Sequence, residues 1–159
     1  MLAAGYQLQL IRSYRDCSEP NAIEPTVYLP SLNEPRGGVL AEVDKSRRLL
    51  KITFASDIAP GDVRACLDRL ESFLPEMQQG FRLLTDLSGV TSMSISTAPC
   101  IGQIMELCTQ KGLESVVRVL PAEPRNDIGF AIMSQFHYGA DVRIVVCDSL
   151  EEARDHLAD

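Results

Sequence analysis

The stretch Phe81–Lys111, FRLLTDLSGVTSMSISTAPCIGQIMELCTQK, carries the strongest structural signals in the sequence. Its first part, Phe81–Leu87, is an apolar run bounded by turn residues, which is typical of a buried strand. Small and mostly hydroxylated residues follow over 88–98. Pro99 suits a first helical turn, and apolar residues then recur at helical spacing. The stretch therefore predicts a strand, a hydroxyl-rich turn over 88–98 and a helix over 99–111.

The junction between this strand and this helix is a candidate binding site. The N-terminus of a helix presents free backbone N–H groups and a partial positive charge, which favour an anion or a phosphorylated side chain. Ser and Thr hydroxyls also form caps and turns without any ligand. Both interpretations fit the sequence at this stage.

Length and charge narrow the class of protein. The chain of 159 residues suggests one domain with room for a tail, and its net charge is −7. Such a charge argues against a general nucleic-acid binder and against an anionic membrane surface as partner. No apolar run reaches the roughly 18 residues of a membrane span, and the N-terminus does not resemble a secretory signal. We therefore expect a cytoplasmic protein without nucleic-acid or membrane partners.

The first 38 residues differ from the rest of the chain. Prolines recur every five residues from Pro20 to Pro35, and this density forbids a continuous helix and breaks a sheet ladder. We predict a Pro-rich N-terminal extension over 1–38 and an α/β domain over 39–159. The extension is either mobile or an arm whose strand at Tyr6–Ile11 adds to a sheet edge.

Strands and helices alternate through the predicted domain. The sequence opens with a β-hairpin and then predicts three further strands, each preceded by a helix, before a closing helix that starts at the capping box of Ser149 and Glu152. This order indicates a mixed, mostly parallel sheet of four to five strands with an N-terminal hairpin, flanked by about four helices. The strands are predicted at Val39–Val43, Leu49–Phe54, Phe81–Leu87, Val116–Leu120 and Val142–Val146.

Two side-chain expectations follow from these elements. The helix that starts near Asp127 should turn Ile128, Ala131 and Ile132 toward the core. Arg118 interrupts an apolar strand and should lie on an exposed face or edge.

Two short segments are informative: Thr85–Thr91, TDLSGVT, and Val145–Ala153, VVCDSLEEA. Both resemble parts of STAS domains, the fold shared by anti-sigma-factor antagonists and sulfate-transporter tails. The resemblance covers about residues 39 to 157. It implies a sheet packed by helices and a regulatory protein that binds a partner kinase or switch protein. It also implies control by phosphorylation of a serine at the start of the second helix.

The family's switch motif, Asp-Ser-Ser-Gly, aligns with Ser94, Ile95, Ser96 and Thr97. The phosphoacceptor position is then Ile95, which has no hydroxyl. Three interpretations stay open: Ser94, Ser96 or Thr97 accepts phosphate after a shift of register, the domain binds its partner without phosphate control, or the fold serves another purpose. We favour the second.

The sequence thus predicts a non-enzymatic, regulatory protein-interaction module without cofactor or metal, and it leaves a homodimer open. An alternative is a carrier of a small apolar ligand or lipid. The predicted partner-binding residues are Ser88, Thr91, Ser92, Ser94, Ser96, Thr97 and Ile101.

Cys100 supports a further alternative, a cysteine-dependent enzyme. It lies in the first turn of the central helix, where the helix dipole lowers the pKa of a thiol. The chain has two histidines, His137 and His156, and neither is placed by sequence to act as a base. Asp57, Asp62 and Asp86 could approach one another at the carboxyl edge of the sheet and hold a cation, but capping explains Asp57 and Asp62 without a metal.

Overall fold

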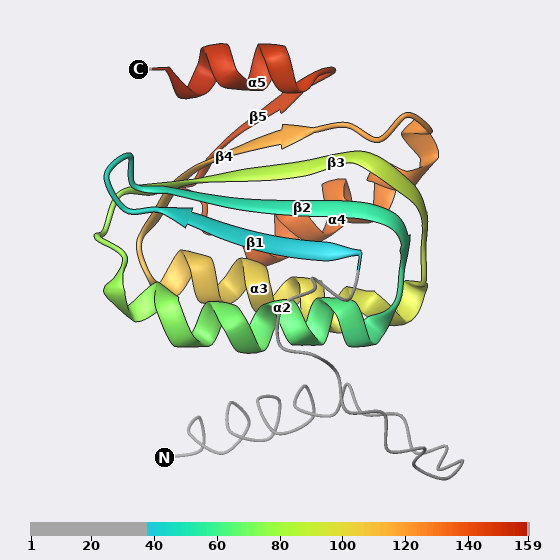
Figure 1. Cartoon of the computed structure of the whole chain (residues 1–159), viewed down its shortest axis with the longest axis horizontal. Helices are drawn as coiled ribbons and strands as arrows, with labels where there is room; N and C mark the ends of the chain where they lie inside the picture. Colours follow the sequence, from blue (N-terminus) through green and yellow to red (C-terminus); the bar gives the residue numbers. More distant parts are fainter. Residues whose placement is uncertain (1–37, 159) are drawn as a thin grey trace, which may run out of the picture. The chain divides into compact units, whose positions relative to one another are not determined.

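The computed structural model describes residues 38–158, and its helices and strands alternate in the predicted order (Figure 1). The predicted extension over 1–38 lies outside the described residues, apart from Gly38. The strands are β1 (Val39–Asp44), β2 (Leu49–Ile58), β3 (Phe81–Met93), β4 (Leu113–Val119) and β5 (Arg143–Cys147). The α-helices are α2 (Pro60–Phe73), α3 (Ala98–Gln110), α4 (Ile128–His137) and α5 (Leu150–Leu157). The 3₁₀ turns are η1 (Leu74–Glu76), η2 (Ile95–Thr97) and η3 (Pro124–Asp127).

The five strands form one sheet in the order β1-β2-β3-β4-β5. The hairpin pair β1–β2 is antiparallel, and the pairs β2–β3, β3–β4 and β4–β5 are parallel. The mixed, mostly parallel sheet with an N-terminal hairpin is therefore confirmed. Each parallel pair needs a crossover, which α2, α3 and α4 supply.

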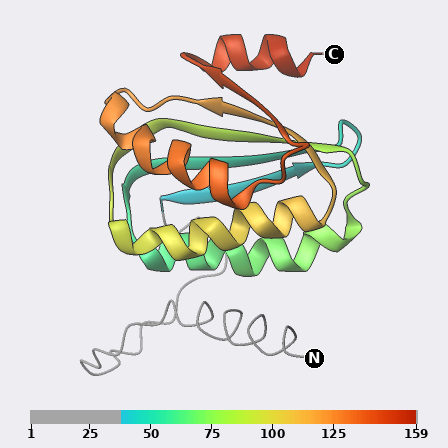
Figure 2. The same cartoon turned by 180° about the vertical axis from the view of Figure 1, so that it is seen from behind.

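Helices cover both faces of the sheet. α2, α3 and α4 lie on one face and α5 lies across the other (Figures 1 and 2). On the first face, Phe130 of α4 packs edge-on against Phe54 of β2, with ring centroids 5.3 Å apart. On the second face, α5 closes a smaller apolar cluster of Leu84, Val117, Val119, Cys147, Ala153 and Leu157.

The strand β3 is longer than predicted. It continues to Met93, so the turn expected over 88–98 shrinks to Ser94 and η2. The sequence pattern stops at Leu87 because the following residues are small and polar, but β2 also extends to Ile58 and continues to pair with β3. The register between the two strands shifts twice, between Thr53 and Ala55 and between Ser56 and Asp57 of β2, and at each shift β3 contains one extra residue, as in a β-bulge. Long-range pairing has overridden local turn propensity here.

The expectations for Ile128, Ile132 and Arg118 are wrong, and Ala131 is half-buried. Ile128 and Ile132 are 58% and 52% exposed, whereas Ser134 is buried and Arg118 is only 5% exposed. The helix is rotated because Arg118 Nη1 donates to Ser134 Oγ at 2.9 Å and its guanidinium approaches Asp127, with Nε 3.0 Å from Oδ1. A buried guanidinium needs such partners. Ser134 of α4 therefore faces the sheet together with Phe130, whereas Ile128 and Ile132 face out.

Within residues 38–158, every helix falls short of the length and apolar character that crossing a membrane requires.

Candidate functional site

A pocket of about 220 Å³ lies beside the end of β3. Its walls come from η2, the first turn of α3 and the start of α4, and they are mostly apolar. Among the described residues, Arg125 is the one charged side chain in the lining. The apolar lining includes Met93, Ile95, Ile101, Phe130 and Met133.

Ile95 stands at the rim of this pocket and is 91% exposed. Its exposure is imposed by the backbone around it. The amide of Ser94 donates to Ile58 O at 3.2 Å, and the amide and hydroxyl of Thr97 both donate to Ser94 O, at 3.0 and 2.7 Å. These bonds tie η2 to the end of β2 and to the start of α3, so Ile95 is presented from an anchored turn.

The predicted hydroxyl residues form two groups. In the first group, the hydroxyls donate hydrogen bonds to carboxylates of the same molecule. Ser88 Oγ donates to Asp86 at 2.6 Å. Thr91 and Ser92 donate to Asp57 Oδ1 at 2.9 and 2.6 Å. These bonds lower the pKa of Asp57, the bond from Ser92 having the larger effect. The carboxylate of Asp57 therefore stays ionised beside this corner.

The second group lies at η2 itself. Ser94 and Ser96 are exposed, and their Oγ atoms are 2.6 Å apart. Thr97 is 1% exposed, and Ile101, at 4%, forms part of the pocket lining. The structure therefore brings Ser94, Thr97 and Ile101 together in the pocket lining, with Ser96 beside Ser94. It places Ser88, Thr91 and Ser92 along the extended end of β3.

Cys100 lies in the first turn of α3, as predicted, and its side chain is fully buried. His137, in α4, has its Nδ1 2.7 Å from Glu106 Oε1, and His156 belongs to α5 on the other face of the sheet. Burial also raises the pKa of the thiols of Cys66, to about 11, and Cys108, to about 12, so both are protonated at neutral pH. A thiol needs access to solvent and a nearby base to act as a nucleophile.

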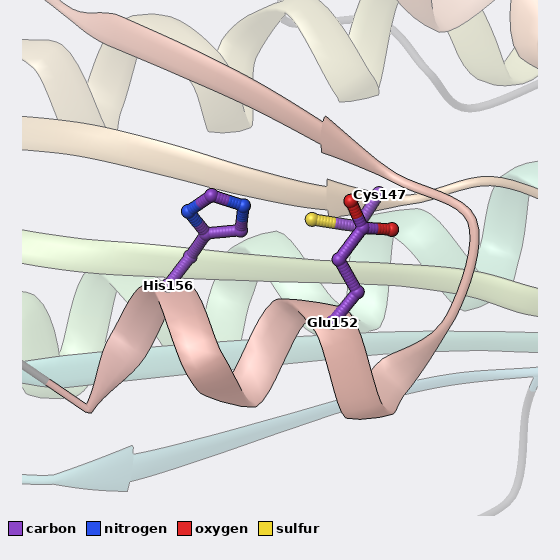
Figure 3. Close-up of side chains that lie close together, drawn as sticks. All are labelled: Cys147, Glu152 and His156. Carbon is purple, nitrogen blue, oxygen red and sulfur yellow. The ribbon is translucent and has the colours of Figure 1, made fainter.

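The three aspartates considered as metal ligands have separate hydrogen-bond partners. Asp57 and Asp86 accept the bonds described above, and Asp62 Oδ2 accepts from the amide of Ala59 at the start of α2. Within residues 38–158, the one group of three potential ligands lies elsewhere, at Cys147, Glu152 and His156 (Figure 3). The spacing C-x₄-E-x₃-H could have indicated this group in the sequence. The apolar neighbours of Cys147 instead indicated a core residue.

An apolar stripe on α4 also escaped sequence reasoning. Ile128, Ile132 and Phe136 recur every four residues, and Phe136 is 77% exposed. On the edge strand β5, Ile144 and Val146 are 37% and 45% exposed. Periodicity alone predicts that such a stripe faces the core. The one signal against this in the sequence is Arg118, which interrupts the apolar strand β4 and needs polar partners if it is buried.

The fold resembles that of known proteins although the sequence does not. No family model matches the chain, and no curated protein matches it. The crystal structure of an uncharacterized protein of the DUF3478 family from Shewanella loihica, described as having a SpoIIAA-like fold, matches with a TM-score of 0.58. The two share 14% identity over 80% of this chain and 99% of that one. The chain has a STAS-like fold.

Two further solved structures match with lower TM-scores. An anti-sigma factor antagonist from Mycobacterium paratuberculosis matches with a TM-score of 0.49 and 16% identity, over 79% of this chain and 97% of that one. Apo-SiaC from Pseudomonas aeruginosa matches with a TM-score of 0.48 and 15% identity, over 69% of this chain and 92% of that one.

Proposed function

We propose that this chain is a non-enzymatic regulatory module that binds a protein partner at the corner formed by η2, the first turn of α3 and the start of α4. The observation that carries the proposal is Ile95, which is 91% exposed on an anchored turn at the rim of an apolar pocket. By resemblance to STAS domains, the partner would be a kinase or switch protein.

The physical argument rests on apolar complementarity. A single exposed isoleucine is ordinary on a protein surface. Ile95 differs because it sits beside a pocket lined by Ile101, Phe130 and Met133, and because hydrogen bonds hold its turn in place. A partner that buries Ile95 and inserts an apolar side chain into the pocket gains contact area without ordering a loop.

The proposed module works without the serine switch at its usual position. Ile95 occupies the place of the family's phosphoacceptor and cannot be phosphorylated. Ser94 and Ser96 flank it, are exposed, and would present a phosphate near Arg125 and the start of α3. Thr97 is the least accessible candidate, because it is buried and its hydroxyl donates to Ser94 O. We therefore keep Ser94 and Ser96 as the residues where phosphate control would act.

The experiment compares two exposed isoleucines. A photo-crosslinking residue at position 95 in the native host identifies the partner, and affinity for that partner is then measured for Ile95→Asp and for the matched control Ile144→Asp on β5. Burying an aspartate at the centre of an interface should weaken binding by about tenfold or more, whereas a site outside the interface should change it by less than about twofold. Equal affinities of the two variants would remove this corner as the contact face.

A small-ligand carrier is the second candidate, and the apolar lining of the pocket favours it. Its volume of about 220 Å³ lies below the range of roughly 300–1,000 Å³ of typical ligand pockets, so a small apolar molecule fits better than a lipid. Native mass spectrometry of freshly purified protein distinguishes the candidates. The carrier is supported if the unchanged protein retains a bound molecule and the Ile101→Trp variant, whose larger side chain would fill the pocket, does not.

A further inference from the structure

Three potential metal ligands converge where β5 meets α5. Cys147 is the last residue of β5, and Glu152 and His156 lie in α5 (Figure 3). One ligand atom of each, the thiol Sγ, a carboxylate oxygen and an imidazole nitrogen, lies within 4.8 Å of the other two. These residues belong neither to the proposed partner corner nor to its pocket.

Local structure fixes two of the ligands on one side of the helix. Glu152 and His156 are four residues apart and so lie on the same side of α5. Ser149 caps the helix by accepting from the amide of Glu152 at 3.2 Å, and Glu152 Oε2 accepts from the amide of Asp148 at 2.9 Å. The bond from Asp148 engages Oε2 of Glu152 and leaves the other carboxylate oxygen available.

The third ligand approaches from the sheet. Cys147 is 1% exposed within the apolar cluster under α5, and Ala153 and Leu157 of the helix are buried in the same cluster. This packing fixes the distance between the helix and the end of β5. Glu152 and His156 are exposed, so the three side chains define a site at the edge of the domain with one side open to solvent.

We propose that Cys147, Glu152 and His156 bind a Zn²⁺-like transition-metal ion. A thiolate, an imidazole and a carboxylate together suit a borderline ion such as Zn²⁺. Ca²⁺ and Mg²⁺ prefer all-oxygen sites. Three protein ligands leave the fourth tetrahedral position for water or an external donor. Small side-chain rotations close the ligand atoms around the ion, at about 2.0–2.3 Å from it.

The bound ion would hold α5 against the end of β5. Its ligands link the end of β5 to both the first and the last turn of the helix, so binding to the folded state stabilises that connection. The inference does not depend on the proposed partner corner.

The test uses the untagged 159-residue chain in a buffer whose reductant does not bind metals. Co²⁺ is titrated as a spectroscopic probe and then displaced with Zn²⁺. We expect one equivalent of Co²⁺ to give a thiolate-to-cobalt charge-transfer band. Cys147→Ser should abolish that band, and Glu152→Gln and His156→Asn should each weaken Zn²⁺ binding by about tenfold or more.

Matched controls separate this site from the other thiols and imidazoles. Glu151→Gln changes the neighbouring carboxylate, and His137→Asn changes the only other histidine of the chain. Both should bind Zn²⁺ within about twofold of the unchanged protein. Circular dichroism in chelator verifies that each variant is folded.

Two results would overturn the proposal. One is a charge-transfer band that persists in Cys147→Ser, because it would come from other cysteines. The other is Zn²⁺ affinity that is the same in His156→Asn and His137→Asn. The second comparison stands even if Cys147→Ser fails to fold, since His156 is exposed and its replacement leaves the core intact.

Discussion

Two strand-to-helix junctions at the carboxyl ends of parallel strands are built in opposite ways. At the first, β3 continues past its buried part to Met93, and the 3₁₀ turn η2 then leads into α3. At the second, β5 ends at Cys147 and Ser149 caps α5 at once. The two helices lie on opposite faces of the sheet (Figure 1).

The difference shows what each junction offers a ligand. The first leaves an apolar side chain, Ile95, exposed beside a pocket, and most of its hydroxyls bond within the molecule. The second buries its apolar residues and gathers a thiol, a carboxylate and an imidazole. The contact that we propose at the first junction is therefore apolar, and the ligand that we propose at the second is a metal ion.

The largest expected effect concerns the buried arginine beside the first junction. Arg118→Ala should lower the free energy of unfolding by about 3–5 kcal/mol, because it leaves Asp127 and Ser134 without their buried partner. Burial already raises the pKa of Asp127, with Arg118 acting against it. Urea unfolding measures the effect.

Arg143→Ala is the matched control for Arg118→Ala. Arg143 is an exposed arginine on the neighbouring strand and its removal should change stability by less than about 0.5 kcal/mol. Similar losses in the two variants would mean that the ion pair does not hold α4 in place.

The second junction should respond to loss of apolar packing. Leu157→Ala removes a side chain that is 3% exposed in the cluster under α5, and it should cost about 2–5 kcal/mol. Hydrogen exchange should then show faster opening of α5 than of α3. Unchanged protection of α5 would contradict the role of this residue in docking the helix.

The sequence predicted the second junction better than the first. The predicted N-cap Ser149 is confirmed by its bond from the amide of Glu152, three residues on, although the carboxylate of Glu152 accepts from the amide of Asp148 and not from that of Ser149. The end of β3 depends instead on pairing with β2, more than thirty residues away, which local turn propensity cannot reveal. The order of elements along the chain and the hairpin could therefore be predicted from local patterns, but the extension of β2 and β3 could not.

The side-chain predictions also failed where a contact joins residues far apart in the sequence. Periodicity placed Ile128 and Ile132 in the core because apolar residues at helical spacing usually face it. The buried Arg118 on β4 reversed the helix face, and this contact joins residues that no local pattern links. The group of Cys147, Glu152 and His156 could have been predicted from local spacing alone. It was missed because the apolar neighbours of Cys147 indicated a core residue.

Helix caps give a smaller contrast between the junctions. Ser149→Ala should cost about 1 kcal/mol, because its hydroxyl caps α5 at 3.2 Å from the amide of Glu152. Ser94→Ala should cost less, since its bond to the amide of Ser96 is 3.4 Å long and serves only a three-residue turn. Thermal unfolding at neutral pH compares them. A larger loss for Ser94→Ala would reverse this ranking.

The smallest effect is a titration at the end of β3. The hydroxyls of Ser92 and Thr91 lower the pKa of Asp57 in the folded state. A lowered folded-state pKa contributes stability that is present above the unfolded pKa and disappears as pH falls through the folded one. Ser92→Ala removes the stronger bond, so the pKa of Asp57 should rise toward its ordinary value.

Carboxyl NMR measures this pKa in the folded protein. Ser94→Ala is the control, because the hydroxyl of Ser94 bonds to Ser96 and not to Asp57. If Ser92→Ala left the pKa of Asp57 unchanged, the hydroxyls of β3 would not be committed to this carboxylate. They would then be available to a partner, and the first junction would offer a polar contact as well as Ile95.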